Sequence, residues 1–558
     1  MFIPSTTDEF KARGWDRADV ILVTGDAYID SPSVGISIIG HVLMNAGFRV
    51  GVISQPAGSA DISRLGEPRL FWGITSGAVD SMVSNYNADR SRRRHDDLTP
   101  GGANNARPDR ACIAYTGLIR SCFKKTVPIV LGGIEASLRR IAHYDYWQNT
   151  IRRSILFDAK ADIIIYGMGE LAVLSLAQKI SGGADYRTLP GICFIANEAP
   201  AGALELPSFE EALSDVDAFA KMFLMAGSGP EQVLVQKHGA RFLVQNPPSR
   251  ILTPAELDRV YELPYERELH PYCAAMGSVR ALETIRFSLT THRGCFGGCN
   301  FCSISMHQGG SVVSRTEDSL IREAVSLSRH ALFAGVISDA GGASANMYGT
   351  SCAAHVGACR NKSCLMPAVC PSLRVDHGRL TMLLAKLREL PGIKHLFVAS
   401  GIRYDLILAD EKNGEAYLRE LVEHHISGLM RIAPEHSSPH VLELMGKPSS
   451  DKLIAFRNMF EKIIKKTGKK TGLSYYLMAA HPGCSLEDMS DLQKVAGVKK
   501  GPIPASVQIF TPTPSTLSTL MYYTGKDARS GDPVFVERDM GKKQKQKRSV
   551  MTFDLRKR

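Results

Sequence analysis

The most informative stretch of this chain is a short cysteine-rich run, Gly294-Cys295-Phe296-Gly297-Gly298-Cys299-Asn300-Phe301-Cys302. Its spacing is C-x3-C-x2-C. Three thiolates this close can bind three irons of a [4Fe–4S] cluster, because such clusters are held by cysteine thiolates. The run has no fourth cysteine, so the fourth iron stays open for a substrate or cofactor, by the logic of the open position in a catalytic zinc site. Zinc is the alternative, but it normally takes four protein ligands from paired C-x2-C arms.

The same spacing resembles the signature of the radical S-adenosylmethionine (SAM) enzymes. The resemblance implies that the open iron binds the amino and carboxylate groups of SAM. It also implies that one electron from the cluster cleaves SAM and releases a 5′-deoxyadenosyl radical. Glycines at 294, 297 and 298 agree with a loop whose backbone closely approaches the cluster. We therefore predict Cys295, Cys299 and Cys302 as the ligands of a SAM-binding [4Fe–4S] cluster.

Length and composition are typical of a large enzyme with several domains. The chain has 558 residues, of which 44% are apolar, so it can bury substantial cores. Its first residues, 1–9, have neither the basic nor the apolar region of a signal peptide. No run of about 18 apolar residues occurs, so no membrane span is expected. Seven of the twelve cysteines lie between 295 and 370, which indicates metal binding rather than disulfides and predicts a reducing, cytoplasmic location.

Strands and helices alternate in the first part of the chain. Buried parallel strands are indicated by short apolar runs at 19–24, 48–53, 127–131 and 162–166. We therefore predict an α/β fold that begins with a doubly wound parallel sheet over residues 1–200. Residues 201–280 are expected to form a mixed connector, because prolines from Pro247 to Pro271 interrupt regular structure.

The first domain resembles the cobalamin-binding domain that precedes many radical SAM domains. The shared points are Gly132-Gly133 after one strand and Gly167-Met168-Gly169-Glu170 after the next. That family ligates cobalt through the pattern Asp-x-His-x-x-Gly, and the matching stretch here is Asp30-Ser31-Pro32-Ser33-Val34-Gly35. Proline stands where the ligating histidine would be, which argues against cobalamin without excluding it. The alternative is a sheet that serves as a scaffold or substrate platform.

A second alternation of strands and helices begins near residue 284. Strands are predicted at 285–290, 335–338, 395–399, 429–433, 474–478 and 506–510. Six β/α units make a radical SAM partial (β/α)6 barrel, which we assign to residues 281–515. Active sites of barrels lie at the carboxyl ends of the strands, and the three cysteines directly follow the first strand.

Polar residues and glycines follow the other predicted strands of the barrel. By the resemblance, a Gly-Gly stretch after the second strand receives the SAM amino group, although Ala343 stands where the family usually has glutamate. The residues predicted to bind SAM share a position at a strand end: Asp339, Gly341, Gly342, Ser400, Arg403 and Glu435. Loop capping explains any one of these residues equally well. Only their common position at the carboxyl ends of the barrel strands indicates an active site. No residue is assigned to catalysis on the substrate.

A second cysteine group occupies the predicted insertion at 343–372. It consists of Cys352, Cys359, Cys364 and Cys370, with spacing C-x6-C-x4-C-x5-C. Four thiolates would saturate either an auxiliary [4Fe–4S] cluster or a zinc ion. The alternative is that these thiols act as small apolar groups in a core.

The C-terminal extension, residues 516–558, ends in a basic tail. Residues 538–558 contain nine Lys or Arg against two Asp, whereas the whole chain has a formal net charge of +11. We predict an exposed, disordered tail that can attract RNA or ribosomes electrostatically. The alternative is a tail that only aids solubility.

Several motifs together resemble the YgiQ family of radical SAM proteins. They are His292-Arg293-Gly294-Cys295, Ala433-Pro434-Glu435-His436, His481-Pro482-Gly483-Cys484, Tyr144-Asp145-Tyr146-Trp147 and Met521-Tyr522-Tyr523-Thr524-Gly525. The resemblance runs from about residue 15 to 535. It implies SAM and a three-cysteine [4Fe–4S] cluster, and it implies little about the substrate.

Two functions follow from the sequence. The first is a radical SAM enzyme that acts on an unidentified substrate and receives electrons from a reductant such as flavodoxin or ferredoxin. The second is a non-catalytic metal-binding protein that associates with RNA or ribosomes through its basic tail. Formation of 5′-deoxyadenosine from SAM distinguishes them.

Overall fold

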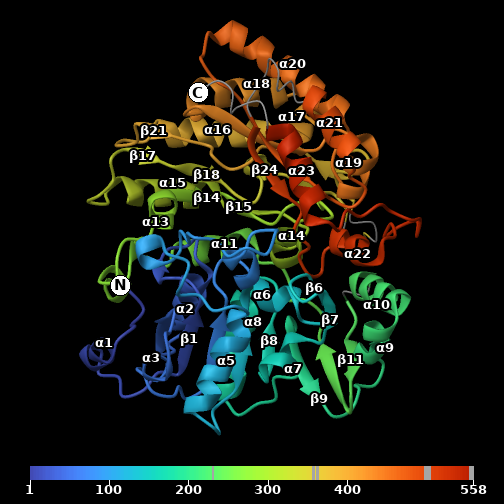
Figure 1. Ribbon diagram of the computed structural model, residues 1–558. Helices are drawn as coiled ribbons and strands as arrows, with labels where there is room; N and C mark the ends of the chain where they lie inside the picture. Colours follow the sequence, from blue (N-terminus) through green and yellow to red (C-terminus); the bar gives the residue numbers. More distant parts are fainter. Residues whose placement is uncertain (229–230, 355–358, 360–362, 496–503, 552–558) are drawn as a thin grey trace. The chain divides into compact units, whose positions relative to one another are not determined.

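The computed structural model describes the chain except for residues 229–230, 355–358, 360–362, 496–503 and 552–558. The chain forms two compact units, shown as ribbons in Figure 1. The N-terminal unit comprises 1–251, 259–286 and 513–515, and the C-terminal unit comprises 252–258, 287–512 and 516–558. Each unit has its own hydrophobic core.

The N-terminal unit is built on a nine-stranded sheet. Five strands run parallel in the order β3 (Val50–Ser54), β1 (Val20–Thr24), β4 (Phe71–Thr75), β5 (Ile129–Leu131) and β8 (Ile163–Ile165). β1 and β3 are buried along their whole length, as parallel strands covered by helices are. Because the first strand lies between the second and the third, the order is that of flavodoxin-like doubly wound sheets. The predicted fold class is confirmed for this unit.

Four further strands extend this sheet beyond β8: β9 (Ile192–Ala196), β12 (Arg241–Gln245), β11 (Leu234–His238) and β10 (Leu204–Leu206). β12 is antiparallel to both β9 and β11. The prediction of a connector over 201–280 is therefore wrong for its first part. The prolines on which it depended begin at Pro247, after β12 ends, whereas Val235 and Val244 pair across two strands inside the core.

Helices and short strands complete the N-terminal unit. α2 (Gly35–Asn45) contacts α8 (Glu170–Ser181) and β3. The other elements are α1 (Thr7–Ala12), β2 (Ile29–Asp30), α3 (Ser59–Ile62), α4 (Ser81–Asn85), η1 (Pro100–Gly102), α5 (Ala111–Cys122), α6 (Gly133–Leu138), β6 (His143–Asp145), β7 (Thr150–Arg152), α7 (Ile155–Ala159), α9 (Phe209–Ser214), α10 (Val216–Ser228), β13 (Glu268–Leu269), α12 (Pro271–Ala274) and α13 (Ala281–Ile285). Helix α11 (Pro254–Tyr261) is divided between the two units.

The C-terminal unit contains parallel strands that follow one another in chain order. They are β14 (Ser288–Thr290), β17 (Val336–Ile337), β18 (Asp339–Gly341), β21 (His395–Leu396), β22 (Leu429–Glu435), β23 (Gly472–Ala479) and β24 (Pro504–Ile509). β14 pairs with β18, β17 pairs with β21, and β22, β23 and β24 pair in sequence. A parallel bridge between Ile402 and Ile432 joins the two halves of the series. Because β17 and β18 form one interrupted strand, the series has six members, and the predicted partial barrel is confirmed.

Amphipathic helices cover the outside of this series. On α15 (Glu317–Ser328), Leu320, Ala324 and Leu327 are buried at spacings of four and three, so one face of the helix packs into the core. The other elements are β15 (His292–Arg293), α14 (Ser303–Gln308), β16 (Val313–Ser314), η2 (Ala345–Met347), β19 (Ser351–Cys352), β20 (Leu373–Arg374), α16 (His377–Arg388), α17 (Tyr404–Ala409), α18 (Gly414–Glu420), η3 (Leu421–His425), α19 (Pro439–Met445), α20 (Ser450–Thr467), α21 (Leu486–Val495), α22 (Leu517–Thr524) and α23 (Met540–Met551).

The basic C-terminal segment is a packed helix up to Met551. On α23, Lys543, Gln546 and Val550 are buried at spacings of three and four. Lys543 Nζ donates to the Tyr522 hydroxyl at 3.1 Å and lies 4.8 Å from the Tyr522 ring centroid. The prediction of a disordered tail is therefore wrong for 540–551, because a count of charges ignores the helical spacing of the three inward residues; 552–558 lie outside the described residues.

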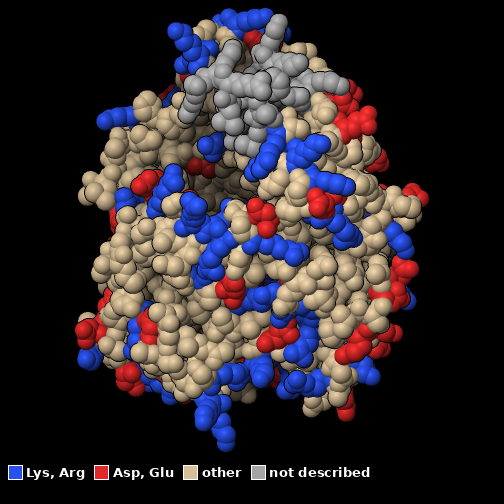
Figure 2. Space-filling model, in the orientation of Figure 1, with Lys and Arg blue, Asp and Glu red and all other residues tan. Residues whose placement is uncertain are grey.

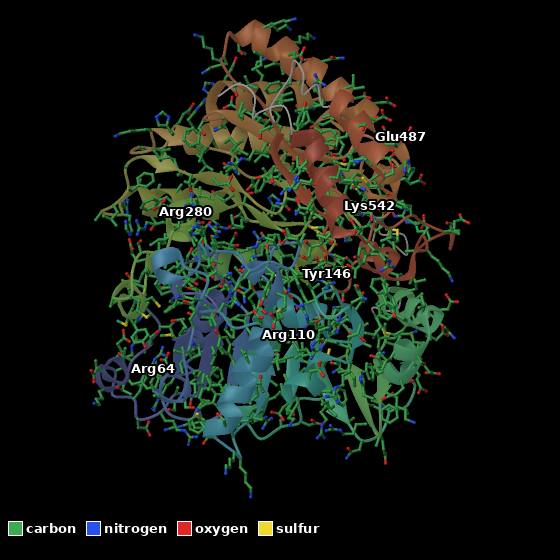
Figure 3. The ribbon with its side chains drawn as sticks, viewed as in Figure 1. Arg64, Arg110, Tyr146, Arg280, Glu487 and Lys542 are labelled. Atoms are coloured by element: carbon green, nitrogen blue, oxygen red, sulfur yellow. The ribbon has the colours of Figure 1, made fainter. Side chains whose placement is uncertain are left out.

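Positive charge is not confined to that helix. Lys542, labelled in Figure 3, is exposed on α23. In the space-filling view of Figure 2, Lys and Arg side chains are interspersed with Asp and Glu over both units. Among the described residues, no helix has both the length and the apolar character needed to cross a membrane.

Candidate active site

The three cysteines of the C-x3-C-x2-C run lie in one loop between β15 and α14. The start of the loop requires glycine, because Gly294 has a φ of +84° and a Cβ there would overlap the Ser311 carbonyl. The middle is fastened to α19: Asn300 N donates to Met445 O at 2.9 Å, and Asn300 Nδ2 donates to Leu444 O at 2.9 Å. The cysteine loop is therefore held in place at the carboxyl end of the first strand.

The thiols of Cys295 and Cys299 meet close to Gly297. A Cβ atom on Gly297 would lie 3.1 Å from Cys295 Sγ, 3.7 Å from Cys299 Sγ and 3.3 Å from Arg403 Nη1. Cys302 N donates to Cys299 O at 3.0 Å, so the third cysteine lies beside the second. Burial, with the neighbouring Cys299 and Cys295 thiols, raises the pKa of Cys302 to about 11. Three thiols and one cation form a compact set of groups that fits the three protein-bound corners of a [4Fe–4S] cluster.

Arg403 is buried and held from two sides. Its guanidinium donates to Asp405 twice, from Nε to Oδ1 at 2.9 Å and from Nη2 to Oδ2 at 2.5 Å, while Nη1 donates to Cys299 Sγ at 3.5 Å. Asn346 Oδ1 accepts from Arg403 N at 2.8 Å, and Asn346 Nδ2 donates to Arg403 O at 2.9 Å. Burial works to lower the pKa of Arg403, but Asp405 and Cys299 raise it by more, so a fixed positive charge lies beside the cysteines.

Asp339 and Ser400 lie together at the ends of neighbouring strands. Asp339 Oδ1 accepts from the backbone N–H groups of Ala399 at 2.8 Å and Ser400 at 3.1 Å, and the Ser400 hydroxyl donates to Asp339 Oδ2. A Cβ on Gly341 would lie 2.9 Å from Ser400 Oγ. These residues therefore fix one another's position, which brings the predicted pair together but leaves the Asp339 carboxylate already hydrogen-bonded.

Gly342 lies directly against His292, the first residue of β15. A Cβ on Gly342 would lie 2.8 Å from His292 Nε2, so a larger residue would displace the ring. The ring is buried, and its Nδ1 lies 2.8 Å from Thr291 Oγ1. Burial lowers the pKa of His292 to about 4, so the imidazole is neutral at physiological pH. Gly342 thus leaves the backbone next to the cysteine loop free of side-chain atoms.

Glu435 ends β22 in an uncommon conformation. Its φ is +66°, which is rare for a residue with a side chain, and it is followed by the buried His436. Burial raises the pKa of Glu435, while Lys447, at 3.9 Å, and Arg403 partly oppose this effect. Glu435 therefore belongs to the same set of charged groups as Arg403, at the carboxyl ends of the strands.

The site also contains residues that the sequence patterns did not single out. Asn346 and Lys447 hold Arg403 and Glu435, respectively, and Asp405 neutralises Arg403. Asp405 lies two residues after Arg403, a spacing that could have suggested the pair. Asn346 and Lys447 are distant in sequence from the groups they contact, and no local signal identifies them.

The second cysteine group lies in the same unit. Cys352 is on β19, Cys364 and Cys370 are half-buried, and Cys359 is exposed. Within the part of the chain that the structure describes, no three His, Cys, Asp or Glu side chains surround a single metal position. A cubane cluster places each thiolate on a different iron, so its ligands do not share one such position.

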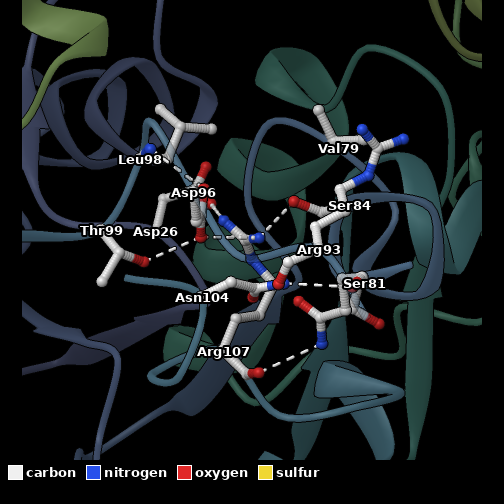
Figure 4. A network of polar contacts seen from close by, with 12 residues as sticks. Asp26, Val79, Ser81, Ser84, Arg93, Asp96, Leu98, Thr99, Asn104 and Arg107 are labelled. Atoms are coloured by element: carbon white, nitrogen blue, oxygen red, sulfur yellow. Dashed lines mark hydrogen bonds and ion pairs between the residues drawn. The ribbon is translucent and has the colours of Figure 1, made fainter. Parts of the chain in front are cut away.

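In the N-terminal unit, a network of buried ion pairs lies at the carboxyl ends of the parallel strands. Arg107 lies between Asp26, which follows β1, and Asp96, and it also bonds Ser84 (Figure 4). Ligands of doubly wound sheets bind at this point, beyond the carboxyl ends of β1 and β4.

Solved structures with a similar fold are radical SAM enzymes. The methyltransferase TsrM from Kitasatospora setae matches with a TM-score of 0.50 and 14% identity, covering 88% of this chain and 74% of TsrM. OxsB, a cobalamin-dependent radical SAM enzyme, matches with a TM-score of 0.52 and 11% identity, covering 94% of this chain and 58% of OxsB. Both are described with cobalamin bound, so the comparisons do not support our prediction against that cofactor.

Sequence relatives cover the chain almost completely. The family model "Radical SAM N-terminal" matches residues 2–288. A UPF0313 protein of Fusobacterium nucleatum is 49% identical over 98% of both chains. A UPF0313 protein of Thermotoga petrophila is 45% identical over 99% of this chain and 98% of its own. The chain therefore belongs to the UPF0313 proteins, the YgiQ family of radical SAM proteins.

Proposed function

We propose that this protein reductively cleaves S-adenosylmethionine at a [4Fe–4S] cluster bound by Cys295, Cys299 and Cys302. When bound, the cluster and SAM supply a one-electron cleavage that yields methionine and a 5′-deoxyadenosyl radical, which takes a hydrogen atom from a substrate carbon. The observation that carries the proposal is the meeting of two of these thiols with the Arg403 guanidinium at Gly297, at the strand ends of a partial barrel. The non-catalytic alternative is not favoured, because the fold and the family are those of radical SAM enzymes.

Each residue of the site has a task in this proposal. The three thiolates hold the cluster and leave its fourth iron open. Arg403 offsets the negative charge of thiolates and cluster, and its burial keeps that interaction strong. Gly341 and Gly342 let the SAM amino group approach the backbone, and Asp339 with Ser400, together with Glu435, lines the same rim.

The reaction needs an electron donor and a compartment that protects the cluster. We propose a one-electron reductant such as flavodoxin or ferredoxin and a reducing, cytoplasmic location. Hydroxocobalamin added during reconstitution tests for that cofactor: cobalamin that co-elutes with the protein in gel filtration indicates binding. No step of the proposal depends on it.

Arg403 is expected to be needed for SAM binding. Removing a buried charged partner costs about 1.5–3 kcal/mol, so Arg403→Ala should weaken SAM binding by about tenfold or more. Arg403→Lys keeps the charge but loses the paired bonds to Asp405 and should give an intermediate affinity. Equilibrium binding of SAM to the reconstituted protein measures the effect, with the midpoint potential of the cluster as a second readout. Unchanged affinity in Arg403→Ala would remove this residue from the SAM site.

Isotope transfer tests the proposed action on a substrate carbon. Cell extract from cultures grown in deuterated medium is fractionated and offered to the reduced protein with unlabelled SAM. A fraction that contains the substrate should place deuterium in 5′-deoxyadenosine, because the radical removes hydrogen from carbon. If 5′-deoxyadenosine forms but stays unlabelled with every fraction, the proposed hydrogen abstraction is wrong.

A further inference from the structure

The second cysteine group is brought together by a small hairpin. β19 pairs with β20 so that Cys352 faces Leu373, and Ala353 N donates to Ser372 O at 2.7 Å. The hairpin closes both ends of the insertion. Leu373 N donates to Cys370 O at 2.9 Å, which places Cys370 directly beside this closure. Cys352 and Cys370, 18 positions apart in the sequence, are thereby adjacent in the fold.

Cys364 lies next to this pair. Cys370 N donates to Cys364 O at 2.8 Å, which closes a turn between them. Cys352, Cys364 and Cys370 therefore lie together in the fold. Cys359 belongs to the same insertion, five positions before Cys364. Cys359 is exposed and the other three are only half-buried, so they are not apolar filling of a core.

This group packs against the cysteine loop of the candidate active site. A small hydrophobic cluster is formed by Phe296, Met347, Leu365, Leu373 and Leu406. Cys352, Cys364 and Cys370 pack against it from one motif, and Cys295 packs against it from the other. Phe296 belongs to the C-x3-C-x2-C run itself, so both cysteine groups pack against a single apolar cluster.

We propose that Cys352, Cys359, Cys364 and Cys370 bind a second [4Fe–4S] cluster, which rests on the proposed function of the first. All four irons would be ligated by protein, which leaves no open position for SAM and suits electron transfer. An external one-electron donor of the flavodoxin or ferredoxin class reduces the second cluster, which is oxidised again when it passes that electron to the first. Zinc would bind four thiolates equally well. However, zinc is not redox-active, so it could not pass an electron to the first cysteine group.

Metal analysis of two complementary variants tests the proposal. Full-length protein is reconstituted without oxygen with iron and sulfide, and iron, zinc and the spectrum of the reduced clusters are measured. We expect about eight irons in the wild type, about four in the Cys295→Ala/Cys299→Ala/Cys302→Ala variant and about four in Cys364→Ala/Cys370→Ala. Cys122→Ala, at the end of α5 and outside both groups, is the matched control and should keep the wild-type content.

Each result decides the proposal. One zinc, or no metal, in the triple variant overturns it. If the triple variant fails to fold, the Cys364→Ala/Cys370→Ala variant gives the same information. Wild-type iron content in that variant would also overturn the proposal of a second cluster. The two proposals fail differently: absence of SAM cleavage in the wild type with about eight irons present contradicts the proposed function alone.

Discussion

Alanine in place of any one of Cys295, Cys299 and Cys302 is expected to abolish SAM cleavage. A [4Fe–4S] cluster that keeps only two protein ligands at this site has no replacement thiol in the loop, because Cys352, Cys364 and Cys370 belong to the separate insertion closed by β19 and β20. The expected loss is complete, to the level of protein without iron. Iron content and 5′-deoxyadenosine, measured after anaerobic reconstitution and reduction, report the effect.

The control for these variants keeps both cysteine groups intact. Cys122→Ala removes a half-exposed thiol from the end of α5 in the N-terminal unit and should cleave SAM at the wild-type rate. Retained cleavage together with wild-type iron in any of the three alanine variants would remove that cysteine from the ligand set.

Arg107→Met is expected to destabilise the N-terminal unit by about 3–5 kcal/mol, because it leaves two buried carboxylates without their cation. Asp26 and Asp96 are 2% and 6% exposed, and Arg107 is 1% exposed, so water cannot replace the lost partner. Burial already raises the pKa of Asp26, against the opposing effect of Arg107. Denaturant unfolding of the full-length protein measures the loss.

The pH dependence of this variant identifies the cause. Without Arg107, the folded-state pKa of Asp26 rises further above its unfolded value, so the folded state favours the protonated carboxyl. The stability deficit should therefore be smaller at low pH and grow as pH rises above the unfolded pKa of the carboxyl. Arg69→Met is the control: Arg69 pairs with Asp16 at 3.0 Å, but both are exposed, and the expected loss is at most about 1 kcal/mol. Equal losses in the two variants would contradict a buried network.

The parts of the fold that repeat a simple pattern could be predicted from the sequence. Runs such as 19–24 and 429–433 are short, mostly apolar and followed by glycine or proline, and both form parallel strands in the structure. The cysteine loop was recognisable because its ligands lie within eight positions, so the spacing alone carries the chemistry. In both cases the information is local.

The parts that depended on distant contacts could not be predicted. β11 and β12 were missed because each reads as an isolated short run. Only the pairing of β12 with β9, and of β11 with β12, makes them strands. α23 was missed because Lys543 is buried through its contact with Tyr522, which a count of charges does not register. The Arg107 network joins residues 81 positions apart.

In the candidate site, too, the residues marked by a local pattern were predicted, and those held by contacts distant in sequence were not. Arg403 and Glu435 were found because they follow strands, where barrel active sites lie. Asn346 and Lys447, which hold them, come from η2 and the turn after α19, and nothing in their local sequence distinguishes them from surface polar residues. Supporting residues of this kind require the fold before they can be assigned.

Cleavage of SAM by the wild-type protein tests the central claim most directly. The full-length protein is reconstituted with iron and sulfide without oxygen, reduced, and given SAM, and 5′-deoxyadenosine and methionine are quantified over time. The account predicts equal amounts of both products, formed only when protein, reductant and SAM are all present. Protein with a full complement of iron that binds SAM but yields neither product would contradict it.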